Sequence, residues 1–245
     1  MSTLRSRAAL FMGCVAAIAG AQVTLAASPP AQTMKLKVSV DATGFATNTH
    51  TDVVAAVANH SDEPPFMNGE PEHLRVRFDD DKLSEYTDYL QRQLLVYPVG
   101  PYAALFKGKE KAEFDKVVSE LKKVTASKSD RGIKQLPMLP SAEAYELFHT
   151  QLKYLNFKQG SGIAFLSCYK QDDAPIKNGD LFYTFQGLTK DQKYYVSFLC
   201  PVKVKKLPAN LPSTEAASRL GKLAPSDFEP RLDVVDRAIQ SISLQ

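Results

Sequence analysis

The sequence predicts an α+β protein, a single globular domain with a mostly antiparallel sheet and two or three packed helices. Three stretches of strand-like apolar residues crowd one region, at residues 163–169, 181–186 and 194–204. Residues 109–125 carry apolar side chains at helical spacing, with Lys and Glu between them. The chain has 245 residues, of which 44% are hydrophobic, so it can bury a sizeable core.

Three further strands are predicted in the N-terminal half of the domain, at residues 34–40, 73–78 and 94–99. Residues 52–58 are a second apolar run, rich in Val and Ala. A proline-rich loop occupies residues 61–71. The helical spacing of Leu83, Tyr86 and Leu90 predicts a helix between the last two of these strands.

The C-terminal half is predicted to contain two more helices. Ser141 can cap a helix that carries Tyr145, Leu147, Phe148 and Leu152. A hairpin loop at residues 187–193 joins the last two strands, and residues 208–225 are predicted to form a loose segment. A final helix is expected from about Glu229, with Pro230 near its first turn.

Residues 1–27 have the organisation of a secretory signal peptide. Arg5 and Arg7 precede an apolar run at residues 8–19, and small residues continue to Ala27. We expect cleavage after Ala27, a short linker at residues 28–33 and one α+β domain over residues 34–245. The mature protein is then expected in the periplasm or outside the cell.

Two alternatives concern the N-terminus. An uncleaved membrane anchor would use residues 8–27, which approach the ~20 residues that a span needs. Lipidation at Cys14 would need a lipoprotein signal, and Gly13-Cys14 meets its minimum requirement. Phe11 and Met12 depart from that signal, so we interpret Cys14 as an apolar residue of the leader. No second apolar stretch is long enough to span a bilayer in the mature chain.

Charge and motifs argue against several classes of function. The formal net charge is +3, and it falls close to zero when Arg5 and Arg7 are removed, which does not favour a nucleic-acid partner. No cofactor is predicted, because the chain has no glycine-rich phosphate loop and no dinucleotide fingerprint. No metal site is predicted either, because the four histidines have no ligand spacing. They are His50, His60, His73 and His149.

Cys168 and Cys200 are the two cysteines of the expected mature chain. In an oxidising compartment a lone pair usually forms one disulfide, and this is the prediction here. A reactive or metal-binding thiol pair is the alternative, but the sequence offers no CxxC spacing and no close histidine.

The aromatic residues of one predicted hairpin are the candidate binding site. They occupy both faces of the strands, and the proposed binding residues are Tyr183, Phe185, Tyr194 and Tyr195. One face must belong to the core. If the other is open, it suits a peptide, a glycan or a hydrophobic ligand. The alternative is that helices cover both faces.

The same region carries a family pattern. It reads Gly160-Ser-Gly-Ile-Ala-Phe-Leu, Leu181-Phe-Tyr-Thr-Phe-Gln-Gly-Leu-Thr and Lys193-Tyr-Tyr-Val-Ser, followed by Pro201-Val. This pattern resembles a family of exported bacterial proteins, many of them lipoproteins, that has no established biochemical role. The resemblance extends from about residue 71 to the end of the chain. It departs at the hairpin tip, where the family's Asp-Gly is replaced by Asp191-Gln192, so we expect a different turn there.

These observations predict an exported, non-catalytic binding module of the cell envelope or extracellular space, with a peptide, a glycan or an envelope protein as its partner. The alternative is a secreted hydrolase whose acids meet only in the fold. Its first candidates are Glu143, Asp172, Asp173 and Asp180. A purely structural or inhibitory role is the third possibility.

Overall fold

A computed structural model describes residues 35–60, 67–79, 91–142, 144–172 and 174–245. They form one packed α+β domain around a seven-stranded antiparallel sheet, which confirms the predicted fold class. The predicted signal peptide with Cys14, and the predicted helix through Leu83, Tyr86 and Leu90, lie outside the described residues. No helix among the described residues is long and apolar enough to cross a bilayer.

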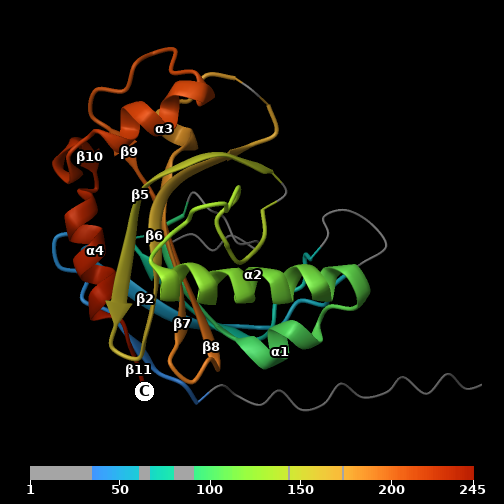
Figure 1. The fold of residues 1–245 in the computed structure, drawn as a ribbon. Coiled ribbons are helices and arrows are strands. Elements are labelled where there is room, and N and C mark those ends of the chain that lie inside the picture. Colours follow the sequence, from blue (N-terminus) through green and yellow to red (C-terminus); the bar gives the residue numbers. More distant parts are fainter. Residues whose placement is uncertain (1–34, 61–66, 80–90, 143, 173) are drawn as a thin grey trace, which may run out of the picture. The chain divides into compact units, whose positions relative to one another are not determined.

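The main sheet has the strand order β2-β3-β4-β8-β7-β6-β5 (Figure 1). Its strands are β2 (Thr49–Val54), β3 (His73–Phe78), β4 (Gln93–Pro98), β5 (Tyr145–Phe157), β6 (Gly160–Lys170), β7 (Phe182–Thr189) and β8 (Tyr194–Pro201). Two short pairs accompany it. They are β1 (Val38–Ser39) with β11 (Ser243–Leu244), and β9 (Lys203–Val204) with β10 (Phe228–Glu229).

The helices of the described residues cover both faces of the sheet (Figure 1). They are α1 (Val99–Ala104), α2 (Gly108–Ser127), α3 (Ser213–Gly221) and α4 (Leu232–Ser241), with 3-10 turns η1 (Asn178–Asp180) and η2 (Pro225–Asp227). One core lies between the sheet and α1 and α2, where Phe114 and Leu121 are buried. The other lies between the sheet and α3 and α4, where Leu232 and Ile239 are buried.

The helix predicted after Ser141 is wrong, because residues 145–157 form the edge strand β5. This strand pairs with β6 but shifts register twice, between Glu146 and Phe148 and between Thr150 and Lys153. Each shift adds residues to one strand of the pair and interrupts the alternation of apolar and polar positions. The interrupted alternation resembles helical spacing, which explains the error.

The structure also corrects the predicted length of one strand and the predicted lack of a helix in one segment. The strand predicted at residues 34–40 is reduced to β1, which pairs with β11 at the C-terminus and not with the main sheet. The segment 208–225, predicted to be loose, contains α3. This helix has nine residues, of which Ala216 and Leu220 are buried, and the prolines at 212 and 225 on either side favoured a loop.

The turn between β7 and β8 keeps a left-handed residue despite lacking glycine. Gln192 has φ of 59°, and its N–H donates to the Thr189 carbonyl at 2.9 Å. Asp191 supports the turn by accepting hydrogen bonds from the Thr189 hydroxyl (2.6 Å) and the Lys193 N–H (3.1 Å). Gln192 thus adopts a positive φ without glycine's freedom, and the side chain of Asp191 stabilises the turn. The expectation that this turn differs from the family's stays a prediction.

The glycines of the Gly160-Ser-Gly162 motif allow close backbone approach within the sheet. A Cβ atom at Gly162 would lie 2.1 Å from the Gln186 carbonyl oxygen, and one at Gly160 would lie 2.0 Å from that of Leu188. Both distances are far below a permitted contact. The motif is thus explained by packing, without a nucleophilic role for Ser161.

The predicted disulfide is also wrong, since Cys168 and Cys200 are free and buried. Cys168 lies on β6 and Cys200 on β8, with β7 between them. Two strand spacings separate the Cα atoms by roughly 10 Å, whereas a disulfide requires about 7 Å or less. The compartment argument predicted a bond that the order of the strands prevents.

We expect both thiols to be unreactive in the folded protein. Burial raises the pKa of Cys168 and that of Cys200 to about 12, so neither forms a thiolate near neutral pH. A thiol reagent at pH 8 should label neither cysteine in the native protein and both in denaturant, as measured by intact mass. Labelling of only one, or a gain of mass on reduction, would contradict this.

Replacement of Gln192 by glycine should stabilise the protein by about 0.5–1 kcal/mol, because glycine adopts positive φ without the steric cost that other residues incur. The measurement is the free energy of unfolding in urea. Lys190→Gly is the matched control in the same turn, where the backbone is not left-handed, and it should destabilise by a similar amount. Equal effects of the two substitutions would refute the explanation.

Candidate functional site

The four aromatic residues predicted to bind a ligand do not form an open patch. Tyr183, Phe185 and Tyr195 have no exposed surface, and Tyr194 is half-buried. Tyr183 and Phe185 pack in the core under α3 and α4, whereas Tyr195 packs in the core under α1 and α2. The structure therefore follows the alternative in which helices cover both faces of the hairpin.

The Tyr195 hydroxyl belongs to a buried hydrogen-bond network centred on Gln186. Gln186 Oε1 accepts from the Tyr195 hydroxyl (2.7 Å) and the Leu139 N–H (3.1 Å). Its Nε2 donates to Thr184 Oγ1 (2.8 Å) and Ser197 Oγ (3.0 Å). All four hydrogen-bonding positions of the amide are used, so the network stabilises the fold and leaves no group for a ligand.

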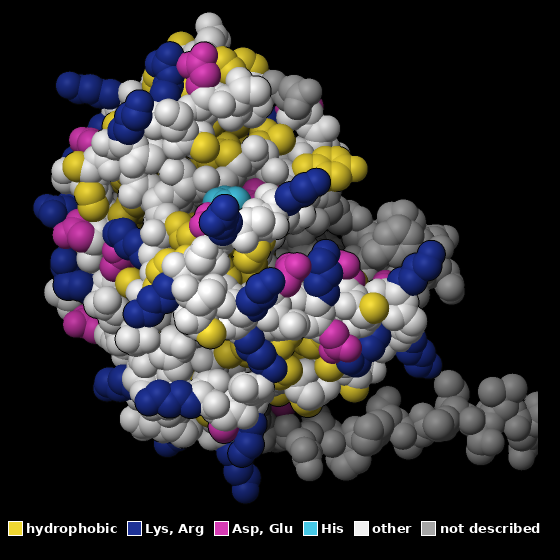
Figure 2. Space-filling view, in the orientation of Figure 1, with side chains coloured by type: hydrophobic (Ala, Val, Ile, Leu, Met, Phe, Trp, Pro, Cys, Tyr) yellow, Lys and Arg dark blue, Asp and Glu magenta, His cyan; other side chains and the backbone are white. Residues whose placement is uncertain are grey.

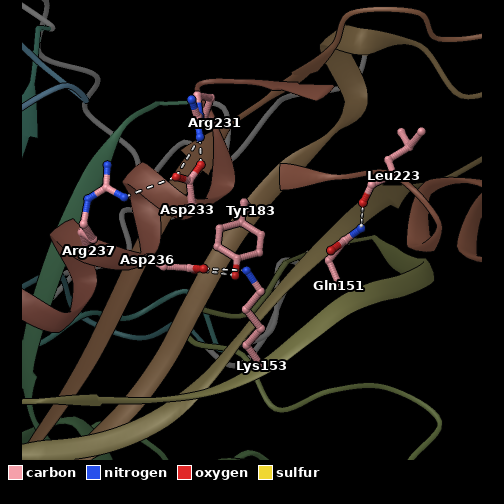
Figure 3. Close-up of polar contacts among 8 residues, drawn as sticks. All are labelled: Gln151, Lys153, Tyr183, Leu223, Arg231, Asp233, Asp236 and Arg237. Carbon is pink, nitrogen blue, oxygen red and sulfur yellow. Dashed lines mark hydrogen bonds and ion pairs between the residues drawn. The ribbon is translucent and has the colours of Figure 1, made fainter. Parts of the chain in front are cut away.

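The Tyr183 hydroxyl lies at an ion pair between two elements, as Figure 3 shows. It donates to Asp236 Oδ1 at 2.8 Å, and Lys153 Nζ lies 2.5 Å from the other oxygen of the same carboxylate. Burial, together with the Asp236 charge, raises the pKa of Tyr183 well above its usual range. The three groups connect α4 to β5 and β7, and a neutral tyrosine in this setting is a poor nucleophile.

Gln151 performs a related connecting role next to this ion pair (Figure 3). It lies at the second register shift of β5, with φ of 54°. Its Nε2 donates to the carbonyls of Leu220 (2.9 Å) and Leu223 (3.0 Å) at the end of α3. The Leu220 carbonyl also accepts from the Leu223 N–H (3.3 Å), so the Gln151 side chain adds a second donor where α3 ends.

The acids proposed for a hydrolase do not form a catalytic pair among the described residues. Asp172 and Asp180 share one cation, with Lys170 Nζ 3.3 Å and 3.4 Å from their carboxylates. The hydrogen bond from the Ala174 N–H lowers the pKa of Asp172, the opposite of what a general acid needs. Glu143 and Asp173 lie outside the described residues.

One cluster of titratable groups was missed by the sequence analysis. The carboxylate of Glu146 is buried and lies 3.3 Å from His149 Nδ1, and it accepts hydrogen bonds from the Ser167 hydroxyl (3.1 Å) and the Leu136 N–H (3.0 Å). The other ring nitrogen of His149 lies 3.6 Å from Asp130. Ser167 thus lies beside a glutamate and a histidine that are three residues apart on β5, about twenty residues earlier in the sequence.

The order of these groups does not match a hydrolytic triad. Ser167 is fully buried and donates to Glu146 and to the Phe148 carbonyl (2.9 Å), while His149 contacts the carboxylates instead of the serine. A triad needs the histidine beside the nucleophile. Among the described residues no group of three His, Cys, Asp or Glu side chains could hold a metal ion. The cluster instead ties the loop around residues 130–136 to β5.

A groove between α2 and the β7–β8 hairpin is the best candidate for a ligand site. Its volume is about 350 Å³, against about 110 Å³ for a second hollow beside Gln135 and Tyr169. The lining residues come from α2, the start of β6 and the hairpin. They are Leu121, Lys122, Thr125, Ala126, Ser161, Leu188, Thr189, Lys190 and Gln192.

The groove combines an apolar floor with a polar, basic rim. Leu121 and Leu188 are buried, while Lys122 and Lys190 are exposed at its sides. The Oγ1 atom of Thr125 is buried and has no hydrogen-bond partner in the described structure. No acidic side chain lines the groove, although basic and acidic side chains are interspersed over the described part of the face that carries α2 (Figure 2).

The chain matches no protein-family model, no curated protein and no solved structure with which it was compared. The resemblance to an exported bacterial family therefore stays a prediction from the sequence pattern. The groove residues were not predicted as a site. The unpaired Thr125 hydroxyl depends on the packing of α2, and its sequence position inside an amphipathic helix gives no signal of it.

The His149 cluster should make stability depend on pH. The hydrogen bond between the His149 ring and the Glu146 carboxylate raises the pKa of His149. The stabilisation is complete below the ordinary histidine pKa, near 6.5, and is lost as pH rises through the raised value. We expect wild type to exceed His149→Gln in unfolding free energy by about 1 kcal/mol below pH 6.5, and the difference to shrink as pH rises above it.

His60→Gln is the control, because His60 is exposed and lies outside this cluster. Its unfolding free energy should follow that of wild type across the same pH series in urea. A His149→Gln difference that stays constant or grows with pH would show that the ion pairs do not stabilise the loop.

Proposed function

We propose that the protein is an exported, non-catalytic binding protein whose ligand occupies the groove between α2 and the β7–β8 hairpin. The signal-peptide pattern of residues 1–27 supports export. The observation that carries the binding site is the buried Thr125 hydroxyl, which has no partner among the described residues and belongs to a residue that lines this groove. An unpaired buried hydroxyl costs about 1–3 kcal/mol, and a ligand recovers that free energy when the Thr125 side chain turns its hydroxyl into the groove to meet it.

The chemistry of the groove selects the class of ligand. Leu121 and Leu188 form an apolar floor that favours a hydrocarbon portion. Lys122 and Lys190 flank it without an acidic lining residue, so a carboxylate or another anionic group is favoured at the rim. Asp191, next to the lining residues Lys190 and Gln192, is engaged by Thr189 and by the Lys193 N–H. The ligand is therefore a small amphipathic anion or an acidic side chain of a partner.

A binding role also agrees with how the other titratable groups are used. Lys170 lies between Asp172 and Asp180, His149 lies between Glu146 and Asp130, and Asp236 accepts from Tyr183 and Lys153. Each of these clusters is engaged within the protein and connects two elements. The lysines of the groove, in contrast, extend from its rim toward solvent.

The binding experiment uses straight-chain carboxylates from butyrate to octanoate, with the alcohols of equal length as neutral probes. Backbone amide shifts in the NMR spectrum should change for the groove residues, and the carboxylates should bind more tightly than the alcohols. Lys122→Gln and Lys190→Gln should each weaken carboxylate binding by about threefold to tenfold, an effect that added salt reduces. Lys123→Gln is the matched control, because Lys123 is adjacent on α2 but does not line the groove.

Thr125→Val separates binding from stability. Valine has a similar shape and removes the unpaired hydroxyl, so the free protein should keep or gain up to about 1 kcal/mol of stability. The same variant should bind the carboxylates more weakly. No shift at the groove with any probe at millimolar concentration, or equal effects of Lys122→Gln and Lys123→Gln, would refute the proposed site.

A further inference from the structure

We propose that the outer edge of β2 pairs with β2 of a second copy of this protein, so that two seven-stranded sheets continue into one another across a two-fold axis. β2 and β5 are the two edge strands of the main sheet, and the β2 edge is separate from the groove. It rests on the open edge, on the protection of the other edge, and on the charges along β2.

The edge of β2 is regular and accessible. Among the described strands it pairs only with β3, in six successive pairs without a register shift. An edge strand directs alternate N–H and C=O groups outward, where another strand can bind them. Thr49, His50 and Thr51 are exposed, and Val53 is 48% exposed although it is apolar.

The other edge of the sheet is protected by its irregularity. β5 contains two register shifts and the left-handed residue Gln151, and α3 and α4 pack against it. Bulges, prolines and lysines are the usual features that prevent pairing at sheet edges. β2 has no bulge, proline or lysine in its sequence Thr-His-Thr-Asp-Val-Val, and the charge of Asp52 is paired with Arg77 within the same protein. Among the described residues, the fold therefore protects the β5 edge and leaves the β2 edge without a neighbouring strand.

The charges of β2 favour a second copy over an unrelated strand. Side chains opposite one another in an antiparallel pair lie on the same face of the sheet. When two copies of β2 pair across a two-fold axis, one residue must therefore lie opposite its own copy, and the axis passes between these two. An axis at Thr51 places His50 of each copy opposite Asp52 of the second copy, and Thr49 opposite Val53. An axis at Asp52 would place two carboxylates opposite each other, which is destabilising. The Thr51 register is therefore the one we propose.

Asp52 already lies in a basic environment that this register extends. Its carboxylate is 2.8 Å from His50, 3.0 Å from Arg77 and 3.8 Å from Arg75. In the pair of sheets each Asp52 would lie between Arg75 of its own β3 and His50 of the second copy. A pairing of five residues buries less surface than the roughly 1,200–2,000 Å² of stable interfaces, so we expect a weak dimer.

Cysteine cross-linking tests the register. In Thr51→Cys the two new thiols would lie opposite each other, with Cα atoms about 4.5–5.5 Å apart. In Thr49→Cys they would be about four residues apart along the strands, roughly 13 Å, and could not bond. Mild oxidation at high protein concentration should convert Thr51→Cys into a covalent dimer, at least tenfold faster than Thr49→Cys. Wild type, with Cys168 and Cys200 buried, is run beside them.

Sedimentation equilibrium tests the edge itself. Wild type should show concentration-dependent dimerisation, and Val53→Lys should be monomeric because a charge on the edge prevents pairing. Tyr145→Lys is the matched control, since Tyr145 is 78% exposed on β5 at the other edge, and it should dimerise like wild type. A wild type that stays monomeric at about 1 mM, equal oxidation of the two cysteine variants, or equal behaviour of the two lysine variants would overturn the proposal.

Discussion

The burial of the central strands on both faces is the constraint on which the rest of the domain depends. All eight residues of β7 are buried, so neither face of this strand can remain uncovered. Phe185 needs the cover of α3 and α4, and Phe182 needs that of α1 and α2. The hydrophobic effect therefore requires two separate helical layers, and the aromatic residues of β7 and β8 serve as the shared core of both.

Polar residues inside this core restrict how the covering segments can lie. Gln186 must satisfy its amide within the protein, because an unpaired buried amide is costly. Gln186 accepts a hydrogen bond from the Leu139 N–H, which fixes the loop between α2 and β5 against the sheet. Glu146 accepts one from the Leu136 N–H and fixes the same loop three residues earlier. Two buried acceptors thus position a segment that has no regular secondary structure.

The two edge strands of the sheet differ in regularity, since β5 shifts register twice and β2 does not. Contacts within the domain therefore use β5, and the proposed contact with another molecule uses β2. The second register shift of β5 places Gln151 at the end of α3 and Lys153 beside Asp236 of α4. Backbone and side chains of this edge are thereby used within the domain. The proposed ligand groove and the proposed pairing strand lie elsewhere, where α2 meets the hairpin and where β2 ends the sheet.

The sequence by itself determined the α+β class, the helix α2 and most of the sheet, because these elements carry a clear period of 3.6 or 2. It did not determine β5, since two bulges remove the period, or α3, which is short and lies between Pro212 and Pro225. Cys168 and Cys200 stay unpaired because of the strand order. Tyr183, Phe185 and Tyr195 are buried because helices cover both faces of the sheet. Those outcomes, like the unpaired Thr125 hydroxyl, were decided by the tertiary structure, because they depend on contacts between residues far apart in the chain.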